Sequence, residues 1–265
     1  MLIEQAFLKL PELLLSNFDH GSEVELTIVH LFASALQMEM NARNIPRPFA
    51  SVLTEKPYEG VAFDRRAVRA DLYVDLSSAV RFDGRMLAYG VRPKNWIEAK
   101  APLMTGRGSP AALRPRLLIR DYFRLCLLPK EWPGTSTALE NGRYLLWILD
   151  KNPRETLAED AWVRPVLKPG VHTVRLDLHS LDEQRAMSLE ASVYTLSFEP
   201  NPHNAPQPLF WGYLLRIVRF RVWNKQQSFV ADDMQERGFS HEAINALEAL
   251  RQAFLLKEDG SVPGA

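Results

Sequence analysis

The tripeptide Glu98-Ala99-Lys100 and the earlier Asp71 carry the side chains of this sequence that are best suited to chemistry on a phosphate ester. Alternate residues of an extended segment share a face, so Glu98 and Lys100 would lie about 6 to 7 Å apart on one side. If Asp71 lies on a nearby strand, two carboxylates and an ammonium group converge. Such a set could hold a hard divalent cation beside a phosphodiester and activate a water, because Mg²⁺ takes carboxylate oxygens, retained waters and phosphate.

Taken alone, the triplet proves little. The 32 acidic residues and the lysines of this 265-residue chain are numerous enough for chance to supply roughly one carboxylate-x-lysine triplet. The competing interpretation is that Glu98 and Lys100 form a solvated pair on a strand. Support for a functional role of the triplet must therefore come from the elements that would position it.

Two segments with strand patterns contain the candidate residues. Over 67–76, apolar residues alternate with Asp71, Tyr73 and Asp75, which predicts a strand with one buried face. The triplet lies in a second predicted strand, 95–101, after a proline that marks a break. The two strands would bring the acidic side chains and the lysine toward one region.

Helical spacing predicts a helix over 22–40, with Ser22 as a suitable cap and Glu25 in its first turn. The spacing over 3–15 is also helical, but Pro11 predicts two short stretches with a turn between them. The other predicted elements are a strand over 60–63 after a proline-containing loop, strands over 85–91, 142–150, 171–178, 191–198 and 212–223, and helices over 111–128 and 240–256. This order predicts an α/β sandwich around a mixed sheet.

Composition is that of an ordinary globular protein, with 46% hydrophobic and 24% charged residues. No apolar run approaches the roughly 20 residues of a membrane span, and the first residues lack the pattern of a signal peptide. We therefore expect no membrane association and a cytoplasmic location. The single cysteine, Cys126, excludes an intrachain disulfide and a thiolate-rich zinc cluster.

The net charge of zero argues against a surface that grips nucleic acid all round, but it leaves room for a local basic cleft. Arginines cluster directly after the triplet, and arginine suits phosphate oxygens. Three of them are spaced four residues apart and would line one stripe of the predicted helix, facing either phosphate or water. The cluster comprises Arg107, Arg114, Arg116, Arg120 and Arg124.

Together these features resemble the restriction endonuclease-like superfamily, the PD-(D/E)xK nucleases. The resemblance rests on Ala70-Asp71 in one strand, Glu98-Ala99-Lys100 in the next long strand, a glutamate-bearing helix before them, and a helix and a strand after them. It covers roughly residues 20–150 and implies an α/β (α+β) fold with a mixed central sheet flanked by helices. Residues 1–150 would form this core with its N-terminal helices, and 151–265 a strand-rich extension and C-terminal helix packed on it as one domain.

Carried over to this chain, the resemblance implies that Asp71 and Glu98 bind Mg²⁺ or Mn²⁺ and that the carbonyl of Ala99 is a further metal ligand. Lys100 would position the attacking water, and Glu25 would join the site. Near two carboxylates Lys100 keeps its charge, so it suits water positioning better than the role of a base.

Some alternatives and departures remain. Asp75 shares a face with Asp71 and could replace or supplement it, and Glu23 could take the place of the other first-turn glutamate. Position 70 is Ala where the motif has Pro. Leu118, four residues before a tyrosine, stands where some exonucleases of the superfamily carry Gln, which puts that branch in doubt.

The function implied by the resemblance is Mg²⁺-dependent hydrolysis of DNA phosphodiester bonds, in restriction or defence. DNA would be the partner, with Arg107, Arg116 and Arg120 as its contacts, and a homodimer is expected where both strands of a duplex are cut. The alternative is a non-catalytic protein that binds nucleic acid or another partner through a degenerate nuclease fold.

Overall fold

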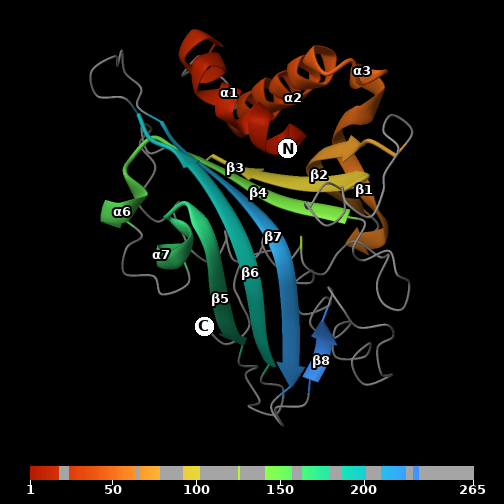
Figure 1. Cartoon of the computed structure of the whole chain (residues 1–265). Helices are drawn as coiled ribbons and strands as arrows, with labels where there is room; N and C mark the ends of the chain where they lie inside the picture. The colour runs from red at the N-terminus through yellow and green to blue at the C-terminus, as the bar shows by residue number, and fades with distance from the viewer. Residues whose placement is uncertain are drawn as a thin grey trace.

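The structure, a computed structural model, is a mixed α+β fold built on one large twisted sheet (Figure 1). The residues that it describes are 1–17, 24–63, 66–77, 92–101, 125, 141–156, 163–178, 187–200, 210–224 and 229–232. Within this part of the chain, no helix combines the length and the apolar character needed to cross a membrane.

The described helices gather mainly at the N-terminus. Two long ones come first, and the others have four residues each. They are α1 (Leu2–Asn17), α2 (Val24–Ala42), α3 (Pro48–Ser51), α6 (Pro153–Thr156) and α7 (Val163–Val166).

The sheet has eight described strands in the order β1-β2-β3-β4-β7-β6-β5, with β8 also paired to β7. Only β3 and β4 pair in parallel among them, so the sheet is mixed, as the sequence predicts. A parallel pair needs a long crossover, and residues 101–140 separate these two strands. The strands are β1 (Val52–Phe63), β2 (Arg66–Asp75), β3 (Lys94–Lys100), β4 (Asn141–Leu149), β5 (Gly170–Leu178), β6 (Met187–Phe198), β7 (Trp211–Asn224) and β8 (Phe229–Asp232).

Most elements predicted from the described part of the sequence are confirmed. The helix expected over 22–40 is α2, and the strands expected over 67–76, 95–101 and 142–150 are β2, β3 and β4. The three later strands are β5, β6 and β7, and they continue the same sheet because β7 pairs with β4. The strand expected over 85–91 and the helices over 111–128 and 240–256 lie outside the described residues, apart from Leu125, which is helical and buried.

Two proline-based expectations are wrong. The helix α1 is continuous through Pro11, although an interior proline costs about 3 kcal/mol. Burial of residues such as Phe7, Leu10 and Leu14 outweighs this cost, at about 1.5 to 3 kcal/mol for each side chain. The strand β1 begins well before position 60 and includes Pro57, which an edge strand tolerates because its outer N–H groups have no partner in the sheet.

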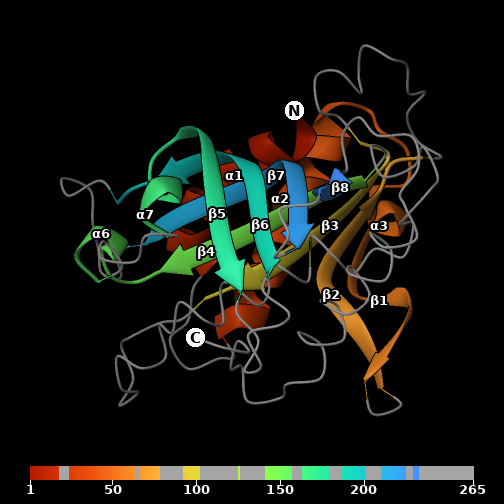
Figure 2. The ribbon, with the colours of Figure 1, turned by 90° about the horizontal axis from the view of Figure 1, so that it is seen from below.

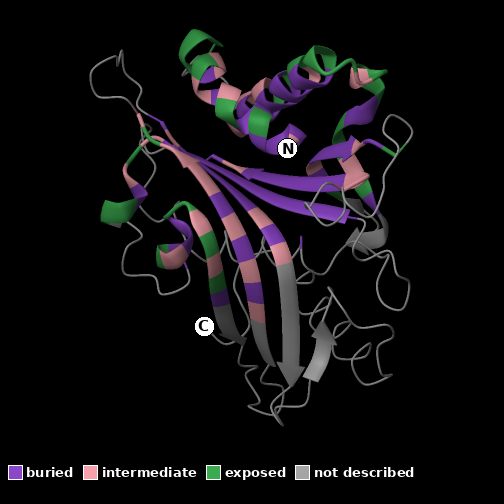
Figure 3. Cartoon of the chain, viewed as in Figure 1, coloured by how far each residue is buried: buried purple, intermediate pink, exposed green. Residues whose placement is uncertain are grey.

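Strand alternation divides the sheet into two buried faces. Helices α1 and α2 cover one face of the sheet (Figure 1). The view from below shows the other face in front of these helices (Figure 2). Leu72 and Ile97 pack toward the helices, whereas Tyr73, Trp96 and Glu98 lie on the opposite face. Both faces are buried in the middle of the sheet, as the colouring of β3 and β4 shows (Figure 3).

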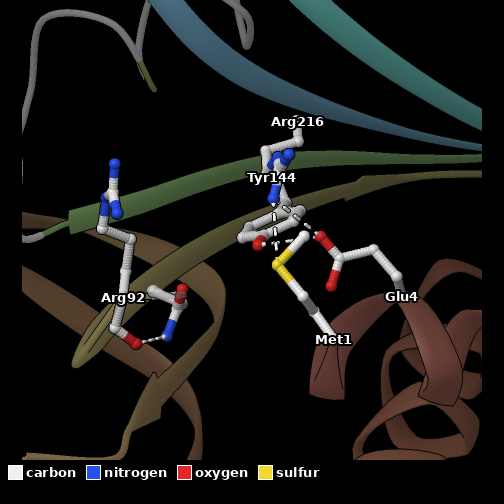
Figure 4. Close-up of polar contacts among 6 residues, drawn as sticks. Met1, Glu4, Arg92, Tyr144 and Arg216 are labelled. Carbon is white, nitrogen blue, oxygen red and sulfur yellow. Dashed lines mark hydrogen bonds and ion pairs between the residues drawn. The ribbon is translucent and has the colours of Figure 1, made fainter. Parts of the chain in front are cut away.

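A buried polar cluster ties α1 to the sheet (Figure 4). The Oε1 atom of Glu4 accepts hydrogen bonds from Arg216 of β7 at 3.2 Å and from the Tyr144 hydroxyl of β4 at 3.4 Å. Burial, with the nearby Glu4 charge, raises the pKa of Tyr144 far above its ordinary value, so its hydroxyl keeps the proton that it donates. Arg216 also lies 3.3 Å from the sulfur of Met1, so the cluster fixes the start of α1.

A second ionic contact joins α1 to α2. The carboxylate of Glu39 in α2 lies 2.6 Å from the Lys9 Nζ atom of α1 and 3.2 Å from the Arg43 Nε atom of its own helix. Hydrogen bonding to Lys9, with a smaller contribution from Arg43, lowers the pKa of Glu39 against the opposing effect of burial. The two long helices therefore cover the sheet as a linked pair.

Leu10→Ala should lower the free energy of unfolding by about 2 to 5 kcal/mol, because the Leu10 side chain of α1 is fully buried in the hydrophobic core. Leu15→Ala in the same helix is the matched control, since Leu15 is 57% exposed, and it should change stability by about 0.5 kcal/mol or less. Urea unfolding measures both values. Equal losses would contradict the described packing of α1.

Glu39→Gln should make the free energy of unfolding depend less on pH in the acidic range. A lowered folded-state pKa stabilises the protein above the unfolded value of 4.5, and this contribution is lost as the pH falls through the folded value. The wild type should therefore lose its advantage over Glu39→Gln as the pH falls below about 4.5, as urea unfolding from pH 7 to 3 would measure. Lys9→Met should remove much of the same pH dependence, and parallel curves for wild type and Glu39→Gln would refute the assignment.

Candidate active site

The candidate site is built where the pairing of β2 with β3 stops. The paired register runs from Asp75 and Lys94 to Leu72 and Ile97. Strand β3 continues beyond this point to Lys100, held on its other edge by β4. The next residues of β3 therefore present backbone groups toward β2 beyond the end of the ladder.

The side chain of Asp71 takes one of these backbone groups. The N–H of Ala99 donates to the Asp71 Oδ2 atom at 2.6 Å. Extrapolating the register of Leu72 with Ile97 by one step makes Asp71 and Glu98 cross-strand neighbours on the face away from α1 and α2. The two acidic residues predicted from the sequence are thus adjacent across the two strands.

The Glu98 carboxylate is deeply buried and has a specific partner. The residue is 1% exposed, and the hydroxyl of Tyr58 donates to its Oε1 atom at 2.7 Å. Tyr58 comes from β1, which lies two strands away from β3 in the sheet. Glu98 is therefore not part of a solvated surface pair, which was the competing interpretation of the triplet.

The Lys100 ammonium group bonds to two oxygens at the rim of the site. Its Nζ atom lies 2.9 Å from the Glu25 Oε1 atom and 2.9 Å from the carbonyl oxygen of Ala99. Glu25 is in the first turn of α2, which covers the opposite face of the sheet, so the lysine side chain bends past the Ala99 backbone to reach it. The Lys100 side chain is 19% exposed and that of Glu25 45%, so this pair borders solvent.

The structure thus brings four predicted residues into direct contact. Asp71 and Lys100 bind the two polar ends of Ala99, and Glu25 binds Lys100. Glu98 is next to Ala99 in β3 and turns its carboxylate to Tyr58. The remaining predicted site residues, Arg107, Arg116, Arg120 and Glu23, lie outside the described residues.

Asp75 belongs to a turn at the other end of β2. Its Oδ1 atom accepts from the backbone N–H of Ser77 at 2.9 Å and from the Ser77 hydroxyl, and its Oδ2 atom accepts from the Tyr73 hydroxyl at 3.4 Å. It lies four residues along the strand from Asp71, or about 13 Å. The alternative in which Asp75 replaces Asp71 is therefore not favoured by the geometry.

The donor set at the end of β3 fits a hard divalent cation in its chemistry. In the described part of the chain, no group of three or more His, Cys, Asp or Glu side chains is arranged to hold a metal ion. Mg²⁺, however, is often held by only one or two carboxylates, with waters and phosphate completing its shell. Asp71, Glu98 and the carbonyl of Ala99 supply such a set, and a cationic group, the Lys100 ammonium, already lies against the Ala99 oxygen.

Sequence reasoning missed Tyr58. The residue follows Pro57 in a segment that was expected to be a loop, and its partner lies 40 positions later. The available signal was the content of β-branched and aromatic residues between Val52 and Phe63, which favours a strand.

Comparisons of this chain with protein-family models, with curated proteins and with solved structures find no match. The contacts around Ala99 are therefore the basis for assigning a function.

The ion pair between Lys100 and Glu25 should contribute little to stability, because it borders solvent and ion pairs open to solvent contribute about 0 to 1 kcal/mol. A double-mutant cycle with Glu25→Gln and Lys100→Met, followed by urea unfolding, should give a coupling energy below about 1 kcal/mol. A coupling of several kcal/mol would contradict this expectation and make the pair a structural one.

Proposed function

We propose that this protein is a Mg²⁺-dependent nuclease that hydrolyses DNA phosphodiester bonds. The observation that carries the proposal is the contact of Asp71 and Lys100 with the backbone of Ala99, together with the ion pair between Lys100 and Glu25. These side chains come from three separate elements, and the sequence resemblance selected them independently of their contacts. If the ion pair between Lys100 and Glu25 were only structural, it would not explain why the acidic residues Asp71 and Glu98 are cross-strand neighbours beside it.

The arrangement of elements supports the same proposal. The resemblance implies a helix, two strands that carry the acidic residues and the lysine, a further helix, and a further strand in a mixed sheet. Here α2 is followed by the antiparallel strands β1, β2 and β3, and then by β4 parallel to β3. We therefore propose a restriction endonuclease-like core within residues 1–150, which β5, β6 and β7 extend on the far side of β4.

The acidic residues would bind the metal and the lysine would position the substrates. Asp71, Glu98 and the Ala99 carbonyl would hold Mg²⁺ or Mn²⁺, which would stabilise charge on the phosphoryl oxygens and ease deprotonation of a bound water. The Lys100 ammonium group has three N–H donors and no lone pair, so it orients water and neutralises phosphate rather than acting as the base. Glu25 limits where the long lysine side chain points, because it binds the Nζ atom directly.

Within this proposal the arginines after the triplet contact the DNA backbone, with Arg107, Arg116 and Arg120 as the named candidates. Cleavage of both strands would use a homodimer, and the enzyme would act in the cytoplasm, in restriction or defence.

A non-catalytic role is the second candidate. It is favoured by the net charge of zero and by the bonds that already engage the site, with Lys100 on the Ala99 carbonyl and Tyr58 on Glu98. In that case the residues would support binding of nucleic acid or a partner without turnover.

Purified protein should nick or cut plasmid DNA when Mg²⁺ or Mn²⁺ is present and stop when the metal is chelated. Asp71→Asn and Lys100→Met should each lower the rate at least about 100-fold, because the first removes the charge of a proposed metal ligand and the second removes the cation proposed to face the reacting phosphate. Asp75→Asn is the matched control, since it changes the same type of side chain on the same strand at the distant turn, and it should keep the wild-type rate.

Gel assays with circular dichroism of each variant would measure activity and folding. Wild-type rates in folded Asp71→Asn would refute the proposed nuclease. Metal-independent DNA binding without turnover by the wild type would instead favour the non-catalytic role.

A further inference from the structure

The contact between Tyr58 and Glu98 is specific and fully enclosed. Both residues are 1% exposed, and the phenol oxygen lies 2.7 Å from the Glu98 Oε1 atom. Hydrogen bonds from a hydroxyl to a carboxylate are short and about twice as strong as neutral ones. A buried carboxylate also needs such donors, because burial removes the water that would otherwise solvate it.

The backbone of β1 is irregular at the point where Tyr58 reaches Glu98. Neighbouring strands lie about 4.8 Å apart, so a side chain from β1 must extend across β2 to meet β3. The register of β1 with β2 shifts between Pro57 and Ala62. Irregularities in strand pairing, such as β-bulges, redirect side chains and are frequent next to functional sites. Tyr58 thus reaches across β2, the strand that carries Asp71, to bond Glu98 of β3.

Aromatic packing fixes the Tyr58 ring. It stacks on Trp96 with ring centroids 4.7 Å apart and planes inclined by 21°, and Trp96 contacts Tyr73 at 4.5 Å. Trp96 and Glu98 are alternate residues on the same face of β3. The stacking limits the movement of the ring and holds its hydroxyl against the Glu98 carboxylate.

We propose that Tyr58 is the positioning residue for Glu98, and that its hydroxyl sets how tightly the site binds a divalent cation. The inference rests on the proposed function, in which Glu98 is a metal ligand. A carboxylate that is already oriented loses less freedom when it binds an ion, so the bound state is favoured. Donors that orient metal ligands in this way change metal affinity about 10- to 100-fold when they are removed.

The test compares Tyr58→Phe with Tyr73→Phe. Both variants remove one hydroxyl from the same aromatic cluster, but the Tyr73 hydroxyl contacts Asp75 at the distant turn. Calorimetric titration with Mn²⁺ alone should give a dissociation constant raised about 10- to 100-fold in Tyr58→Phe. In Tyr73→Phe it should stay within about twofold of the wild type. Thermal unfolding without metal separates a loss of stability, which a merely structural hydroxyl would cause, from a loss of affinity.

Wild-type affinity in a folded Tyr58→Phe protein would overturn the inference and leave the proposed function standing. Equal losses of affinity in the two variants would also overturn it, because they would assign the effect to aromatic packing instead of the hydroxyl. If the wild type binds Mn²⁺ no better than Asp71→Asn does, the proposed metal site fails and the inference fails with it.

A measurement on the wild type covers the case in which Tyr58→Phe does not fold. In protein with isotope-labelled tyrosines, paramagnetic Mn²⁺ should broaden the ring resonance of Tyr58 more strongly than that of Tyr194, a tyrosine of β6 near Arg216. Equal broadening of the two resonances would overturn the inference.

Discussion

The parallel pairing of β3 with β4 holds the two parts of the sheet together and keeps the end of β3 extended. It joins the antiparallel strands β1 to β3 to the strands that follow residue 150, and it runs from Lys94 to Lys100 without interruption. Because β4 holds β3 extended to Lys100, β2 can stop pairing at Leu72 without loss of order in β3. The polar groups of Ala99 are then available to side chains, and the candidate site is made from them.

The helices contribute to the site through their anchoring. Glu4 binds Arg216 and Tyr144 of the sheet, and Glu39 binds Lys9, so α1 and α2 are held by ionic contacts as well as by the apolar core. This anchoring places the first turn of α2 at the end of β3, where Glu25 meets Lys100. The ion pair between Lys100 and Glu25 borders solvent and should contribute little free energy. It can still have a defined geometry, because larger buried contacts elsewhere determine where its two partners lie.

The mixed character of the sheet and the face that Asp71 occupies could be predicted from the sequence, and several details could not. Alternation in β2 is a local property, so it correctly separated Leu72 from Asp71. Both expectations based on proline were wrong for one reason. They considered the local cost of proline without the tertiary contacts that offset it. In α1 the burial of Leu10 and Leu14 outweighs the effect of Pro11, and in β1 the edge position of the strand accommodates Pro57.

Spacing and hydrophobic alternation are properties of neighbouring residues, so they are enough to select the candidate residues and the elements that carry them. Which atoms of these residues come into contact depends instead on how the elements pack. Whether Asp71 reaches the Ala99 N–H depends on where the pairing of β2 with β3 ends, and the contact of Lys100 with Glu25 joins residues 75 positions apart. The partner of Glu98, Tyr58, comes from a strand two positions away in the sheet, next to a shift in the register of that strand. Long-range contacts of this kind leave no periodic signal in the chain, since folding alone brings their partners together.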